Sequence, residues 1–152
     1  MLRNVLPFFL LFFSFSAIAQ KAEFDSIVNL INAHPEKDTT RVNWLMELQT
    51  YSVFDNAEDF LPYMEEALAV SKEIDFGTGI GNSLNGLGVY YFQRSDYNVA
   101  LDYVLQSIDV LDSLGLKNDL ILPYNNLAMI NNRLEHYEEA EKAYRFILKQ
   151  LS

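Results

Sequence analysis

The residues that most resemble a chemical motif are five closely spaced glycines: Gly77, Gly79, Gly81, Gly86 and Gly88. Glycine-rich loops can cradle nucleotide phosphates, because their backbone N–H groups approach the anion closely. Gly81 and Gly86 have the spacing of a Walker A loop, but Leu87 stands where that loop needs lysine. The dinucleotide fingerprint also fails, since Leu84 occupies its third glycine position and no strand is predicted before it. We therefore interpret these glycines as a helix start and as part of a repeat.

The titratable residues do not form a catalytic or metal-binding pattern. His34 and His136 lie in predicted turns, outside any HExxH or paired-ligand motif, where histidine is usually solvated. The acidic residues around His136 are Glu135, Glu138, Glu139 and Glu141. They suit the positive end of a helix dipole better than a cation site. Adjacent carboxylates such as Glu65 and Glu66 point in different directions on a helix, and no GxSxG elbow is present. The sequence predicts no enzyme activity, no cofactor and no metal site.

Helical spacing of apolar side chains recurs after residue 20, and no segment alternates long enough to predict a strand. A first helix should stop at His34-Pro35, and a second should start after the capping residues 38–40 and break at Asp55-Asn56. A third should run to Ile74, with a late start or a kink at Pro62. The remaining predicted helices span 80–93, 97–114 (with Gly115 as its left-handed stop), 118–134 and 138–151. Short loops predict antiparallel hairpins.

A shift of 40 residues superimposes these helix pairs. The shift aligns Trp44 with Leu84 and Tyr124, Tyr51 with Tyr91, Asn85 with Asn125, Leu87 with Leu127, Gly88 with Ala128, Tyr97 with Tyr137, Ala100 with Ala140, and Leu68 with Ile108 and Leu148. The matches fall at equivalent places in each pair, which favours a true internal repeat.

These positions resemble the signature of the tetratricopeptide repeat family, a superhelix of antiparallel helix pairs. The signature residues of the middle unit are Leu84, Leu87-Gly88, Tyr91, Tyr97, Ala100, Val104 and Ser107. Those of the third unit are Tyr124, Leu127-Ala128, Asn131, Tyr137, Ala140, Tyr144 and Ile147. The first unit is degenerate and has Trp44, Glu47-Leu48, Tyr51, Phe60, Met64 and Ala67. The resemblance covers residues 38–152 and implies an all-α solenoid of about seven helices. The period resembles that of the longer repeats in exported regions of bacterial sensor and regulatory proteins. A helix bundle is the alternative fold.

Helix packing agrees with this signature, because helices approach closely only where side chains are small. We expect Gly88 to face Ala100 and Ala128 to face Ala140. In the first unit, Leu48 and Phe60 take these places, so that hairpin should be wider.

The resemblance also implies a concave binding groove on the first helix of each pair. The implied groove residues are Leu45, Gln49 and Ser52 in the first unit, Asn82, Asn85, Val89, Phe92 and Gln93 in the second, and Leu122, Asn125, Met129, Asn132 and Arg133 in the third. Asn85 and Asn125 are equivalent, and their amides suit the backbone of an extended peptide. The alternative is that they are ordinary surface residues.

One way in which such grooves recognise peptides is not expected here. Family members that clamp a terminal carboxylate use a Lys, Asn, Asn, Lys, Arg set. The matching residues of this chain are Leu45, Gln49, Gly86, Leu122 and Asn126. Without cations, this set cannot bind a C-terminal carboxylate.

The first nineteen residues have the layout of a secretory signal peptide. Arg3 precedes an uncharged apolar run, and Ala17-Ile18-Ala19 places small residues before a cut at Gln20. An uncleaved anchor is the alternative, although the run is shorter than a spanning helix requires. The chain has no cysteine, so an exported form would depend on packing without disulfides. Its formal charge of −10 disfavours nucleic acid and anionic membranes as partners.

These observations predict a signal peptide (1–19), an N-terminal helix and linker (20–37) and three helix pairs (38–75, 78–115 and 118–152). The leading functional hypothesis is a periplasmic or secreted scaffold that binds a protein or peptide in its groove. The alternative is the exported sensory fragment of a longer sensor kinase or transcriptional regulator.

The final predicted helix should also have an apolar face that its own hairpin leaves bare. We expect Ala143 and Phe146 to point away from that hairpin, and another chain or further repeats to cover them. A homodimer through residues 138–151 is the simpler case.

Overall fold

The computed structural model describes residues 21–50 and 60–151, and within these ranges every regular element is helical. A first helix covers residues 21–33. It is followed by α2 (Thr39–Glu47), the short 3-10 helix η1 (Leu48–Thr50), α3 (Leu61–Glu73), α4 (Gly77–Gln93), α5 (Tyr97–Ser113), α6 (Ile121–Arg133) and α7 (Tyr137–Gln150). The prediction of an all-α chain is confirmed. The signal peptide, Ser52 and the break at Asp55-Asn56 lie outside the described residues.

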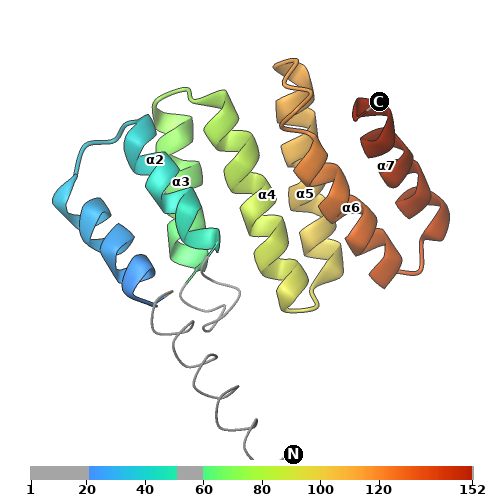
Figure 1. Cartoon of the computed structure of the whole chain (residues 1–152), viewed down its shortest axis with the longest axis horizontal. Helices are drawn as coiled ribbons and strands as arrows, with labels where there is room; N and C mark the ends of the chain where they lie inside the picture. The colour runs from blue at the N-terminus through green and yellow to red at the C-terminus, as the bar shows by residue number, and fades with distance from the viewer. Residues whose placement is uncertain (1–20, 51–59, 152) are drawn as a thin grey trace, which may run out of the picture.

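Consecutive helices pack against each other and run in opposite directions (Figure 1). Within the layer formed by α2, α4 and α6, the central helix α4 contacts both of the others. Helices α3 and α5 lie behind this layer in the view of Figure 1, and α7 packs on α6 at the C-terminal edge. The chain therefore brings the first helices of successive pairs side by side, although they are far apart in sequence.

Four of the described helices end in the same left-handed turn. The residues with positive φ are Asp75 (56°), Ser95 (65°), Gly115 (70°) and Glu135 (62°). After each of them, a backbone N–H bonds back to a carbonyl in the last helical turn: Phe76 to Ser71, Asp96 to Tyr91, Leu116 to Leu111 and His136 to Asn131, at 2.8–3.1 Å. This is the Schellman C-cap. The turns at Asp75 and Gly115 recur at the 40-residue shift seen in the sequence, as do those at Ser95 and Glu135, and Gly115 is confirmed as a helix stop.

The starts of three helices refine the predictions. Helix α4 begins at Gly77 rather than at 80, because the glycines allow its first turn to approach α3 and α5 closely. A Cβ at Gly77 would lie 2.7 Å from Leu114 Cδ1, and one at Gly79 would overlap Phe76 and Ser71. Helix α6 begins at Ile121 rather than at 118, after turns over 117–120. Helix α3 has the late start expected from Pro62, which lies in its first turn, where proline loses no hydrogen bond.

The core has two clusters of buried apolar side chains. The first joins the N-terminal helix to α2, α3 and α4, and its fully buried members include Phe60, Leu45 and Leu48. The second joins α5 and α6, and Phe146 of α7 packs against it. The expected close approach of Gly88 to Ala100 is confirmed, since a Cβ at Gly88 would lie 3.2 Å from the Ala100 carbonyl oxygen.

The expected orientation of α7 is wrong. Ala143 is buried, and the Phe146 ring stacks on Tyr124 with centroids 3.7 Å apart, so both residues face inward. The exposed side chains are instead Tyr144, Leu148 and Leu151. The small Ala143 permits the close helix contact that the bulky Tyr144 would prevent.

Candidate functional site

A groove of about 640 Å³ opens on the layer formed by α2, α4 and α6. Its lining comes from all three helices, from η1 after α2, from the turn before α6 and from one residue of α7. The lining residues are Met46, Gln49, Asn82, Asn85, Asn118, Asp119, Ile121, Leu122, Asn125 and Ile147. The groove exists because α4 contacts both α2 and α6, which aligns the same face of three helices.

Five of the residues expected in a groove line this one, namely Gln49, Asn82, Asn85, Leu122 and Asn125. Leu122 is 57% exposed, which makes it the most accessible apolar side chain in the lining. The structure thus brings together residues from all three predicted repeat units.

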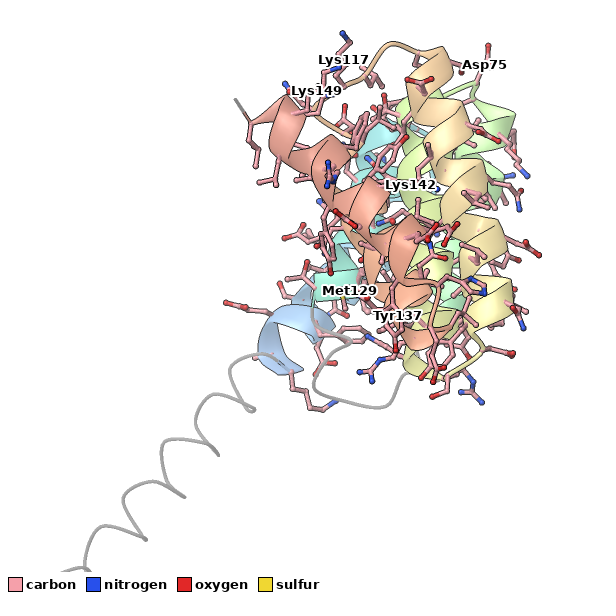
Figure 2. The ribbon with its side chains drawn as sticks, turned by 90° about the vertical axis from the view of Figure 1, so that its right-hand side faces the viewer. Asp75, Lys117, Met129, Tyr137, Lys142 and Lys149 are labelled. Carbon is pink, nitrogen blue, oxygen red and sulfur yellow. The ribbon has the colours of Figure 1, made fainter. Side chains whose placement is uncertain are left out.

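The other expected residues lie elsewhere. Phe92 packs on Tyr97 at 5.6 Å between ring centroids and belongs to the edge of the second core cluster. Leu45 is fully buried. Asn132 lines a separate depression with α7, and Met129 of α6 is exposed (Figure 2). The remaining residues, Val89, Gln93 and Arg133, lie on α4 and α6 outside the lining of the groove.

Asn85 and Asn125 have different environments despite their equivalent sequence positions. Asn85 is only 3% exposed, and its Oδ1 accepts a hydrogen bond of 2.8 Å from Asn126 Nδ2. This bond ties α4 to α6 and fixes the floor of the groove. Asn125 is half-buried, and its Nδ2 lies 3.6 Å from Met129 Sδ on its own helix. Asn85 therefore positions helices, whereas Asn125 presents its amide at the groove.

Part of the lining was not found by sequence reasoning. The sequence places Asn118 and Asp119 at the start of α6, but they form the turn that closes one side of the groove. Met46, Ile121 and Ile147 add apolar surface. The signal that could have located the turn is Pro123, which favours the first turn of a helix and so places its start after Asp119.

The groove combines amides with apolar surface and carries little charge. Among the described residues of its lining, Asp119 is the one charged side chain. Amide groups both donate and accept hydrogen bonds, so they suit uncharged polar groups such as peptide backbone. None of these lining residues is a cation.

A polar cluster at the start of α2 has a structural role. His34, expected to be simply solvated, is half-buried, and its Nε2 lies 3.0 Å from Asp38 Oδ2. Its ring packs edge-on against Trp44. The Asp38 carboxylate caps α2 by accepting a bond from the Arg41 N–H, and this bond lowers the pKa of Asp38.

Arg41 continues this cluster across to α3. Its side chain donates to the backbone carbonyls of Ile31 and His34 and to the Glu66 carboxylate. The cluster therefore joins the N-terminal helix, α2 and α3.

Across residues 21–50 and 60–151, no three His, Asp or Glu side chains are arranged to hold a metal ion. None of the helices in this part of the chain is long and apolar enough to cross a membrane. A scan against known protein families finds no model that matches, and a search of curated proteins finds no similar sequence.

Proposed function

We propose that this chain is an exported protein-interaction scaffold, built as a solenoid of tetratricopeptide-like helix pairs, that binds a polypeptide in the groove of α2, α4 and α6. Export rests on the signal-peptide layout of residues 1–19. The solenoid rests on the repeated C-caps at Asp75 and Gly115 and at Ser95 and Glu135, together with the small residues where paired helices meet.

The observation that carries the binding proposal is that amides of three repeat units converge on one groove. Gln49, Asn82 and Asn125 come from α2-η1, α4 and α6 and line it together. A row of amides along a groove matches the alternating N–H and C=O groups of an extended chain. Leu122 and Ile121 also line the groove and provide an apolar contact surface for one side chain of the ligand. The ligand is expected to be an extended segment without acidic residues, because Asp119 repels them.

A peptide-display selection against the purified protein tests this proposal. The selected peptides should bind the native protein and lose most of their affinity for the variant Leu122→Glu with Asn125→Ala. Removing interface anchors commonly costs about 2 kcal/mol or more, which corresponds to roughly thirtyfold in affinity. Asn85 is left unchanged because its bond to Asn126 holds the helices.

The matched control is Leu105→Glu, the same change at an exposed leucine of α5 that does not line the groove. It should leave peptide binding unchanged. Circular dichroism should show that all variants keep their helix content. Equal loss of binding in the groove variant and the control, or full binding by the groove variant, would place the site elsewhere.

A further inference from the structure

Helix α7 exposes a row of large apolar side chains that no described helix covers. Tyr137, Tyr144, Leu148 and Leu151 are 65%, 39%, 67% and 68% exposed. They follow one another at spacings of seven, four and three residues, so they share one side of the helix. A contiguous exposed apolar row of this kind usually marks a contact surface.

The equivalent row on α5 is covered. Val104, Ile108 and Leu111 stand 40 residues before Tyr144, Leu148 and Leu151, and they are 0%, 9% and 0% exposed. Val104 and Leu111 lie against Gly88 and Gly81 of α4, and the buried cluster to which the row belongs also includes Leu120 and Ile130, so α4 and α6 together cover the row. On α7, which packs on α6, the side chains at the corresponding positions are exposed.

The charges of α7 indicate what kind of helix could pack on its exposed apolar row. Its three acidic residues, Glu138, Glu139 and Glu141, all precede its three basic residues, Lys142, Arg145 and Lys149. Figure 2 looks onto this helix, with Tyr137 toward one end and Lys149 toward the other. The helix is thus balanced in charge, although the whole chain has a formal charge of −10. A helix whose acidic residues precede its basic residues is complementary to an antiparallel copy of itself.

We propose that α7 is a homodimer interface in which two copies of the helix pack antiparallel across a twofold axis near residue 143. At 1.5 Å of rise per residue, this axis places Glu141 of one copy at the height of Arg145 of the other. Because the axis is twofold, this pairing occurs twice in the dimer. The same axis places Tyr137 of each copy at the height of Leu148 of the other copy, with an offset of one residue. It also brings the two Tyr144 rings close together. The axis therefore aligns both the charges and the apolar row.

Within one copy, Arg145 Nη2 already lies 2.6 Å from Glu141 Oε1. Both side chains are largely exposed, at 74% and 62%, so they are accessible to a second copy. In the dimer, the Glu141–Arg145 pair of one copy and the same pair of the other copy would together form a network of four charges. Networks of charges contribute more than single exposed pairs do. The interface is one helix wide, so the dimer should be weak, with a dissociation constant in the micromolar range.

Charge reversal gives a direct test by sedimentation equilibrium of the purified chain. Glu141→Arg and Arg145→Glu should each weaken self-association by about tenfold, because each places like charges together at two symmetric points. An equimolar mixture of the two variants should associate as strongly as the native protein. In the mixed dimer, the arginine introduced in one copy meets the glutamate introduced in the other, and the unchanged Glu141 and Arg145 meet at the second point. Only a contact between copies predicts this rescue.

Glu23→Arg is the control, since it makes the same charge change at an exposed residue of the N-terminal helix. It should dimerise normally. Thermal melts at concentrations below dimerisation should show that every variant folds. A native protein that stays monomeric through the micromolar range, or a mixture that associates no better than its separate components, would overturn the proposal. The first result would assign the apolar row to a different partner.

Discussion

The α4–α5 and α6–α7 pairs have the same backbone plan but different packing. Both first helices end in a C-cap with positive φ, at Ser95 and at Glu135, and the hydrogen bonds of the two caps match one for one. Helix α4 meets its neighbours through five glycines, and α5 is covered by α4 and α6. Helix α6 has no glycine, and α7 is covered on one side by α6.

This difference shows that local sequence sets the turns, whereas neighbouring helices set burial. Leu111 and Leu151 occupy the same place in the two pairs, yet the first is 0% exposed and the second 68%. The burial of positions 40 residues apart therefore depends on the helices that pack around them, and Leu111 lies against Gly81 of α4 in a cluster that α5 shares with α6. The following predictions test how far the two pairs differ.

The largest effect is expected from overpacking the contact between α4 and α5. Gly88→Leu should lower the free energy of unfolding by about 3 kcal/mol, because the Ala100 carbonyl and Val104 leave no room for a side chain. Ala140→Leu in α7 should cost about 1 kcal/mol, since α7 can tilt away from α6. Urea unfolding of both variants measures the difference. Equal costs would mean that α7 is held as rigidly as α5.

A smaller effect should distinguish the two faces of α7. Phe146→Ala removes a ring that stacks on Tyr124 and should cost about 2–3 kcal/mol. Leu148→Ala changes a side chain that is 67% exposed and should cost no more than about 0.5 kcal/mol in the monomer. Thermal unfolding at low protein concentration checks both values. The reverse order would mean that the sequence-based orientation of the helix, rather than the structure, is correct.

The sequence was sufficient to predict helices, their C-terminal stops and the residues at the closest contact, because glycine, proline and apolar spacing act locally. Gly115 and the Gly88–Ala100 contact are examples. The sequence did not predict which side of α7 faces inward. Ala143 and Tyr144 are neighbours, and only packing against α6 decides which one is buried. The groove was predicted in part. Leu45 became a core residue and Phe92 packs at the edge of the core, because the depth of a concave surface depends on all its helices together.

Substitutions at the left-handed caps should change the free energy of unfolding by about 1 kcal/mol. Gly115→Ala should destabilise the protein by about 1 kcal/mol, although nothing lies within 4 Å of the added Cβ, because alanine resists positive φ. Glu135→Gly should stabilise it by up to a similar amount, because the non-glycine strain is removed. Urea unfolding measures both changes. Changes of the same sign would mean that the four caps do not share one conformation.

The smallest expected effect concerns two tyrosines, one in each helix pair. Burial raises the pKa of Tyr91, with Tyr103 adding to the effect, and burial together with Asp112 and Asp109 raises the pKa of Tyr124. The folded state therefore favours the neutral phenol. This contribution to stability is complete below the ordinary tyrosine pKa of about 10 and is lost as pH rises through the raised folded values.

Tyr91→Phe and Tyr124→Phe should each reduce this alkaline loss of stability without changing stability near neutral pH by much. Burial is the main cause in both cases, so added salt should alter the effect little; salt screens charges but does not rehydrate a partly buried ring. Thermal melts across the alkaline range, with and without salt, measure this. If salt abolished the effect at Tyr124 but not at Tyr91, the aspartates of α5 rather than burial would control Tyr124. The two helix pairs would then differ in electrostatics as well as in packing.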